Sequence, residues 1–297
     1  MTHLYAVVPA RDEATRLASL VDQLLRSDLG QATTWAEVVI SDDASQDGTA
    51  ELCALLRSVD GRVTRIGNAG PAAGKVRAVM AGDQYVRTRA AGGDLVLVVD
   101  ADAVVTAGAL KRLVEACSRR PELAAVSGAS VPLTRSLGRW GSSFQMDACR
   151  RAVRVAHGTA IHIDDRLFCY RLGAVADSVW EAGRGMSCDM LLREYLDAAG
   201  LATEWFRDAE ALALPPRGYL AFHMQTSRNR SIAGRAWSAR EGAWAYRLAG
   251  LLEASRHPLR AAAYAMAVAV SHGLSLFVKV RYEDTWRTLE STKHDGR

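Results

Sequence analysis

The sequence predicts an α/β protein with a mostly parallel sheet flanked by helices. Three short apolar runs, Leu4 to Val8, Val38 to Ile40 and Leu95 to Val99, each end at acidic residues. The intervening segments carry apolar residues at helical spacing, among them Leu17, Leu20, Val21, Leu24, Leu52, Leu55, Leu56, Val59, Val76 and Val79. Strands that alternate with helices are typical of a parallel sheet covered on both faces.

The composition indicates an ordinary globular enzyme. The chain has 297 residues, of which 49% are hydrophobic, enough for one core with an appendage or for two small domains. The N-terminus enters an apolar strand without a basic leader, so no signal peptide is expected. The five cysteines are scattered and lack CxxC spacing, so neither a zinc site nor a disulfide framework is expected.

Polar residues follow each of the three apolar runs: residues 9–13, 41–45 and 100–102. The carboxyl ends of parallel strands meet at one edge of a sheet, where ligands bind. Asp100 and Asp102 are separated by one residue and can bind a hard divalent cation, Mg²⁺ or Mn²⁺. The alternative is a solvated strand end with two capping aspartates.

Asp42 and Lys75 are two further candidates for ligand contacts. The carboxylate of Asp42 can accept the imino hydrogen of a pyrimidine base, or it can belong to a turn before a helix capped by Ser45 or Asp47. Lys75 begins a helix, whose first amides could approach an anionic diphosphate with it. The alternative for Lys75 is a plain surface lysine.

Four segments, in order and spacing, closely resemble glycosyltransferase family 2. They are AVVPARDEA (6–14), VISDDASQDGT (39–49), GKVRAVMAG (74–82) and VVDAD (98–102). The resemblance implies a glycosyltransferase type A fold, a UDP-sugar-like donor, a divalent cation and transfer with inversion. The expected reaction moves a hexose or N-acetylhexosamine to a hydroxyl of a lipid, glycan or small-molecule acceptor.

The resemblance also assigns roles to single residues of the donor site. Pro9, Arg11 and Glu13 would line the nucleoside pocket, and Asp42 would contact the base. Asp100 would lie near the ribose or sugar, and Asp102 would hold the metal. Met80 departs from the family, which often has asparagine at this position.

The family also needs a base that takes the proton of the acceptor hydroxyl. The matching residue is Asp189, at the start of a predicted helix, with Cys188 where a glutamate is usual. Its alternative role is a helix N-cap. Residues 225–230 resemble the QxxRW element of membrane-bound polysaccharide synthases, which implies that Gln225 contacts the acceptor and Arg228 the diphosphate, or else these residues form a basic surface helix.

The end of the chain raises the question of a membrane. Residues 261–278 form a run of 18 without a formal charge, close to the length of a membrane span, but rich in alanine and interrupted by serine, histidine and glycine. A buried helix is the alternative. We expect a catalytic domain over residues 1–230 and a helical extension over 231–297 that is interfacial or membrane-anchoring. The expected location is the cytoplasm, at the inner face of the cell membrane if the extension binds there.

The charge of the chain indicates which classes of partner the protein is expected to bind. The formal net charge is +4, and the late excess of arginine suits a phosphate-bearing ligand or an anionic membrane. Nucleic acid is not expected, because neither a binding module nor an aromatic ladder is present. The rival hypothesis is a non-catalytic, membrane-associated nucleotide-sugar binding protein, because Met80, Cys188 and Asn229 depart from the family pattern.

Overall fold

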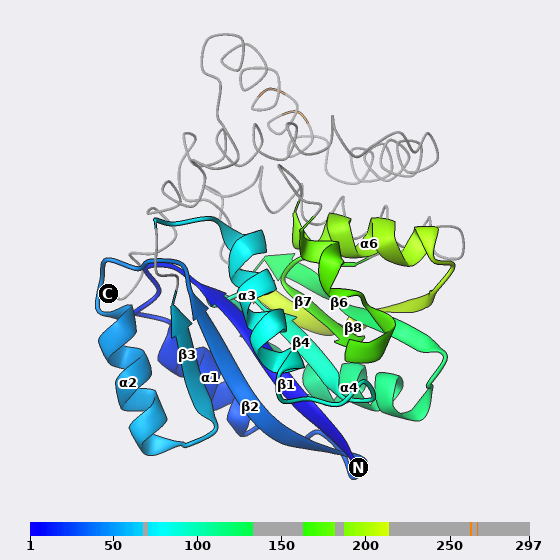
Figure 1. The fold of residues 1–297 in the computed structure, drawn as a ribbon, viewed down its shortest axis with the longest axis horizontal. Coiled ribbons are helices and arrows are strands. Elements are labelled where there is room, and N and C mark those ends of the chain that lie inside the picture. The colour runs from blue at the N-terminus through cyan, green and yellow to red at the C-terminus, as the bar shows by residue number, and fades with distance from the viewer. Residues whose placement is uncertain (68–70, 133–162, 182–186, 214–261, 263–265, 267–297) are drawn as a thin grey trace. The chain divides into compact units, whose positions relative to one another are not determined.

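The computed structural model describes residues 1–67, 71–132, 163–181 and 187–213, with residues 262 and 266 (Figure 1). The chain divides into two compact units. One consists of Met1–Ser130 and Ile161–Leu212, and the other of Val131–Ala160 and Ala213–Arg297. Nearly all of the second unit lies outside the described residues, as does the expected boundary at residue 230, which stays a prediction.

Four neighbouring strands form the parallel half of an eight-stranded sheet. Their order is β3 (Val63–Gly67), β2 (Thr33–Asp42), β1 (Thr2–Ala10) and β4 (Leu95–Val99), and each neighbouring pair is parallel. The three predicted strands are confirmed. All five residues of β4 are buried, as expected for a strand covered on both faces.

The other half of the sheet is antiparallel where pairings are resolved. β7 (Leu167–Arg171) runs antiparallel to β4, and β6 (Leu123–Pro132) runs antiparallel to β7. β8 (Ala202–Ala213) and the short β5 (Val104–Val105) pair antiparallel at the end of the sheet. The chain therefore reverses direction beside β4, and the start of β7 lies next to the end of β4.

Helices cover both faces of this sheet (Figure 1). α1 (Leu17–Leu25), α2 (Thr49–Val59) and α4 (Ala109–Arg119) pack on one face, and α3 (Lys75–Arg87) and α6 (Cys188–Ala198) pack on the other. Alternate residues of β1 serve the two layers, which is the period of two of a strand. The predicted α/β class is confirmed.

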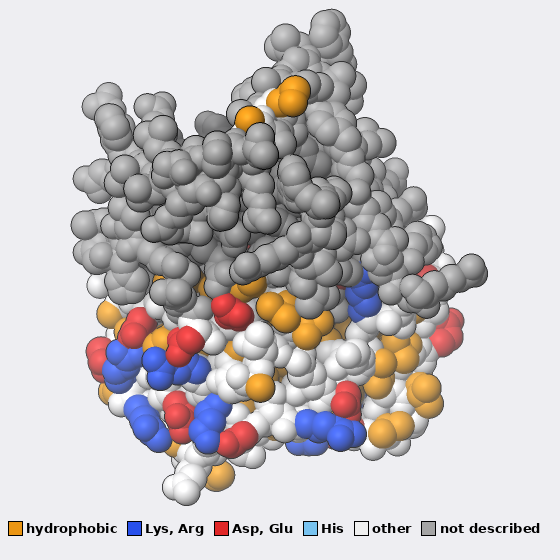
Figure 2. Space-filling view, turned by 180° about the vertical axis from the view of Figure 1, so that it is seen from behind, with side chains coloured by type: hydrophobic (Ala, Val, Ile, Leu, Met, Phe, Trp, Pro, Cys, Tyr) orange, Lys and Arg blue, Asp and Glu red, His pale blue; other side chains and the backbone are white. Residues whose placement is uncertain are grey.

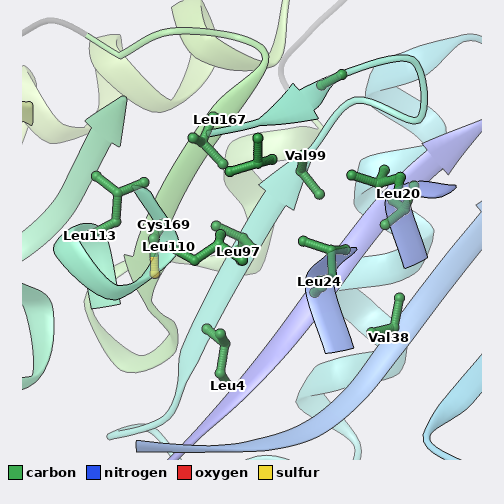
Figure 3. Packing of buried hydrophobic residues seen from close by; sticks show 14 of the residues in the cluster. Leu4, Leu20, Leu24, Val38, Leu97, Val99, Leu110, Leu113, Leu167 and Cys169 are labelled. Atoms are coloured by element: carbon green, nitrogen blue, oxygen red, sulfur yellow. The ribbon is translucent and has the colours of Figure 1, made fainter. Parts of the chain in front are cut away.

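The apolar layer under α1 and α4 is built from aliphatic side chains that exclude water. Leu20 and Leu24 of α1 and Leu110 and Leu113 of α4 are at most 2% exposed. Figure 3 shows these residues against strand residues of the same layer, namely Leu4, Val38, Leu97, Val99, Leu167 and Cys169. Burial of each leucine contributes about 1.5–3 kcal/mol, so this layer holds the ends of β1, β2 and β4 in place.

Acidic and basic side chains are interspersed on the described part of the face in Figure 2. Exposed ion pairs lie on or beside α1 and α4: Arg26 with Asp22 at 2.7 Å, Lys111 with Asp28 at 2.5 Å, and Arg119 with Glu115 at 3.1 Å. Such exposed pairs contribute little to stability. The fold therefore depends on the apolar layers rather than on these charges.

Gly128 of β6 provides a test of the close approach between β6 and β8. A Cβ atom at this position would lie 2.3 Å from the backbone oxygen of Ala209. Because backbone cannot yield as a side-chain end can, Gly128→Ala should lower the free energy of unfolding by about 1–3 kcal/mol in urea denaturation. Gly61→Ala is the matched control, since a Cβ there meets nothing within 4 Å. Equal stability of the two variants would contradict this packing.

Candidate active site

The loops that follow β1 and β2 are hydrogen-bonded to each other. The amide of Asp12 donates to Oγ of Ser45 at 2.9 Å, and the amide of Glu13 donates to Oγ1 of Thr49 at 2.9 Å. Asp12 has φ of 53°, in the left-handed region that aspartate tolerates better than most residues. The two loops thus form one rigid edge above the parallel strands.

The residues predicted to line a nucleoside pocket belong to this edge. Pro9 is the buried penultimate residue of β1, and Glu13 is buried in the loop that follows. The side chain of Arg11 is largely buried, with Nε 3.7 Å from Oδ2 of Asp12. The three residues lie within one five-residue segment of this edge, and their contact with a nucleoside stays a prediction.

Asp42 is fully engaged by neighbouring donors. Its Oδ1 accepts from the amide of Ser45 at 3.0 Å and from the hydroxyl at 2.5 Å, and its Oδ2 lies 2.8 Å from Nε and 2.7 Å from Nη2 of Arg65. The side chain of Asp42 is 0% exposed, whereas that of Arg65 is 40% exposed. A ligand at this position would meet the guanidinium first, so direct contact between a base and Asp42 requires Arg65 to move.

Asp43 fixes the start of α3. Its carboxylate, buried in the edge, accepts the amide hydrogens of Ala73 and Gly74, each at 2.8 Å. Gly74 has φ of 95°, a conformation that glycine adopts without strain. These contacts hold the chain so that Lys75 becomes the first residue of α3.

Lys75 is a largely buried cation, not a plain surface lysine. Its side chain is 15% exposed, and its Nζ lies 2.5 Å from Oδ1 of Asp100 and 2.8 Å from the carbonyl oxygen of Asp165. Burial alone would lower the pKa of Lys75, but Asp100 and Asp165 outweigh it and raise that pKa. Lys75 therefore stays charged at every physiological pH.

Arg166 lies between the two carboxylates that follow β4. Its Nη1 is 3.1 Å from Oδ1 of Asp102 and 3.6 Å from Oδ2 of Asp100, and its carbonyl oxygen accepts the amide hydrogen of Asp100 at 3.1 Å. Burial raises the pKa of Asp100 to about 6, assisted by Asp165 and Asp102 and opposed by Lys75 and Arg166. The aspartates after β4 are thus held in an ion-pair network and are not freely solvated.

The loop before β7 is attached to β6. The carboxylate of Asp164 accepts from the amide of Ser130 at 2.9 Å and from its hydroxyl at 2.5 Å, and the amide of Asp164 donates to Oγ of Ser127 at 2.6 Å. This anchoring fixes the following residues, Asp165 and Arg166, beside the end of β4.

Asp189 is the second residue of α6, and Ser187 occupies the N-cap position. Its Oδ1 is buried and has no hydrogen-bond partner among the described residues. Burial raises the pKa of Asp189 to about 7, and Asp165 adds to the rise, whereas Ser187 and Lys75 act against it. A carboxyl group with a pKa near the operating pH is suited to general base catalysis.

The departures from the family pattern at Met80 and Cys188 are accommodated by packing. Met80 lies against the apolar layer between the sheet and α3, and Cys188 is fully buried in the same layer. Burial raises the pKa of the Cys188 thiol, so it remains neutral. Both positions support the core beside the site and supply no charge to it.

Some expected features lie outside the described residues. These include Gln225, Arg228 and, except for residues 262 and 266, the candidate membrane segment 261–278. Within the described part of the chain, no helix has both the length and the apolar character of a membrane span.

Five residues of the site are not singled out from the sequence: Asp43, Arg65, Asp164, Asp165 and Arg166. A signal exists for the last three, because charged residues 164–166 immediately precede an apolar run. β7 starts where β4 ends, with Leu167 opposite Val99. Residues before an antiparallel strand therefore reach the same edge as residues after a parallel one.

Solved structures with a similar fold are sugar transferases. A mannosyltransferase from Pyrobaculum calidifontis in complex with GDP-Man and Mn²⁺ has a TM-score of 0.58 and 20% identity, over 98% of this chain and 84% of that chain. Mannosyl-3-phosphoglycerate synthase from Rubrobacter xylanophilus has a TM-score of 0.52 and 17% identity, over 79% and 74%. A comparison with curated proteins finds no match.

The sequence matches a family model over most of the described unit. The model of glycosyl transferase family 2 covers residues 5–177, more than half of the chain. The folds of the solved structures agree with the predicted glycosyltransferase type A architecture. The chain therefore belongs to glycosyl transferase family 2 and is a glycosyltransferase.

Proposed function

We propose that this glycosyltransferase moves a hexose or N-acetylhexosamine from a nucleoside-diphosphate sugar to a hydroxyl of a lipid, glycan or small-molecule acceptor, with inversion at the anomeric carbon. The observation that carries the proposal is the meeting of Lys75, Asp100, Asp102 and Asp189 around the loop before β7. UDP is the expected nucleotide. GDP is the second candidate, because the Pyrobaculum enzyme holds GDP-Man.

The start of α3 supplies positive charge for the diphosphate. The first amides of a helix carry partial positive charge and bind anions, and Lys75 at this terminus keeps its proton. Asp43 orients the preceding loop through two amides, so the position of this cationic end is fixed before the donor arrives. Arg228, predicted to reach the same diphosphate, would add a second cation.

The residues present fit a divalent cation, Mn²⁺ or Mg²⁺. Among the described residues, five neighbouring carboxylates share two cations: Asp100, Asp102, Asp164, Asp165 and Asp189 with Lys75 and Arg166. No three acidic, histidine or cysteine side chains in the described part converge to enclose an ion. Asp102 would hold it together with oxygens of the donor, and the ion would stabilise charge on the departing diphosphate.

Asp189 is proposed as the base for a single displacement. As the acceptor oxygen bonds to the anomeric carbon, its proton passes to a carboxylate oxygen of Asp189. The bond between that carbon and the diphosphate oxygen breaks at the same time, and the nucleoside diphosphate leaves with the electron pair. Attack from the side opposite the leaving group inverts the anomeric configuration. Among the described residues the buried Oδ1 has no hydrogen-bond partner, which suits this role because an acceptor hydroxyl would donate one.

A donor panel tests the proposed function. The purified full-length chain is incubated with UDP- and GDP-sugars, Mn²⁺ and a set of hydroxyl acceptors, and released nucleoside diphosphate is measured. We expect release from at least one donor that depends on the acceptor. Binding of nucleotide without release from any donor would favour the rival hypothesis of a non-catalytic nucleotide-sugar binding protein.

Replacement of Asp189 by asparagine separates a base from a structural residue. Asp189→Asn is nearly isosteric, so donor affinity and folding should change little while turnover falls roughly 10²- to 10⁴-fold. Turnover is measured at saturating donor, and nucleotide affinity by calorimetry. Asp197→Asn, at an exposed position of the same helix, is the matched control and should keep normal turnover. Near-normal turnover of Asp189→Asn would withdraw Asp189 as the base.

The raised pKa of Asp189 predicts a pH profile. A base acts when deprotonated, and its pKa of about 7 means that this form grows as pH rises. Turnover at saturating donor should therefore increase roughly tenfold from pH 6 to pH 8 and then level off. The charged groups that set this pKa are Asp165, Lys75 and Asp164. A profile that is flat between pH 6 and 8 in the wild type would contradict the assignment.

A further inference from the structure

Arg166 is a charged residue at the centre of the site to which the proposed reaction gives no role. We propose that Arg166 is a resident counter-cation of Asp100 and Asp102, and that it competes with the divalent cation for Asp102. It would thereby set the cation affinity of the empty donor site. This inference rests on the proposed function, because it concerns the cation that accompanies the donor.

One nitrogen of Arg166 serves both carboxylates. Nη1 lies 3.1 Å from Oδ1 of Asp102 and 3.6 Å from Oδ2 of Asp100, and the three side chains are 16–24% exposed. Two carboxylates this close repel each other when water is largely excluded, and a cation between them relieves the repulsion. A planar guanidinium suits this task better than an ammonium, because it can donate to several oxygens at once.

The backbone holds Arg166 at this place. Its carbonyl oxygen accepts from the amide of Asp100 at 3.1 Å, and its own amide donates to Oδ1 of Asp164 at 3.1 Å. Asp164 is in turn attached to Ser130 of β6. These backbone bonds to the sheet therefore position the Arg166 guanidinium beside Asp102.

A dication held by the carboxylate of Asp102 would adjoin the guanidinium, which lies 3.1 Å from Oδ1, so the two cations would compete for that carboxylate. A diphosphate offers the released guanidinium alternative anionic oxygens. Nucleotide and cation should then strengthen each other's binding, and this coupling is reciprocal by thermodynamic necessity. The empty site would bind the cation weakly, so little cation would be bound before the donor arrives.

The test is a Mn²⁺ titration of the full-length chain without nucleotide, followed by electron paramagnetic resonance. Arg166→Met removes the charge and should tighten Mn²⁺ binding about tenfold or more, because two carboxylates lose their competitor cation. Arg166→Lys keeps the charge but loses the guanidinium's several donors, so its Mn²⁺ affinity should lie between those of the wild type and Arg166→Met. Asp102→Asn in the Arg166→Met background should abolish the gain, which shows that the ion binds at Asp102.

Arg171→Met is the matched control, because Arg171 lies at the other end of β7 and donates to the carbonyl oxygen of Cys117. Its Mn²⁺ affinity should equal that of the wild type. Thermal unfolding shows whether Arg166→Met is folded. If it is not, Arg166→Gln takes its place, with the same expected Mn²⁺ affinity. Mn²⁺ affinity of the folded variant that is equal to or weaker than that of the wild type overturns the proposal.

The donor panel separates this inference from the proposed function. Cation-dependent turnover by the wild type, together with unchanged Mn²⁺ affinity on removal of Arg166, overturns the competition and leaves the proposed function standing. Tighter Mn²⁺ binding without turnover of any donor supports the competition and overturns the proposed function. Absence of Mn²⁺ binding in every variant overturns the competition.

Discussion

The site depends on one electrostatic constraint, the concentration of carboxylates at a sheet edge from which water is largely excluded. Isolated charges are costly there, so each carboxylate must be paired, protonated or supplied with a cation. Lys75 and Arg166 meet part of this demand among the described residues, and the raised pKa values of Asp100 and Asp189 reflect the remainder. The excess of negative charge is what would make the edge receptive to the proposed dication.

The sheet topology assembles this edge from distant parts of the chain. β4 ends at Asp100, and β7 begins directly after Arg166 because it runs in the opposite direction. α3 begins at Lys75 and α6 begins beside Asp189, both on the same face of the sheet. The carboxylates of Asp43 and Asp164 fix the intervening loops by accepting hydrogen bonds from backbone amides. The geometry is therefore set by bonds between these side chains and the main chain, in addition to the strand pairing.

Much of the fold can be predicted from local sequence patterns, whereas the patterns of β3 and β8 are weak. β1, β2, β4, α1, α2 and α3 carry clear periodicity. β3 has only five residues with one arginine, and β8 mixes apolar and charged residues, so neither is evident. α4 does carry a helical pattern, at Leu110, Leu113, Val114 and Cys117, and could have been predicted. Lys75, Asp100 and Asp102 follow from their positions at a helix start and after an apolar run, and the resemblance added Asp189. Arg65 and Arg166 required knowledge of which strands are neighbours and in which direction they run.

Burial raises the pKa of both carboxyl groups beside Lys75, and their charged neighbours determine by how much. Asp100 lies 2.5 Å from Lys75 and within 3.6 Å of Arg166, so both cations favour its charged form and limit the rise of its pKa to about 6. Asp189 has weaker help from Lys75 and faces Asp165, so its pKa rises to about 7. Different neighbours thus hold the pKa of Asp100 lower than that of Asp189, whose carboxyl group can accept a proton near neutral pH. Asp189 is able to accept a proton because α6 places it next to the other carboxylates without giving its Oδ1 a partner among the described residues.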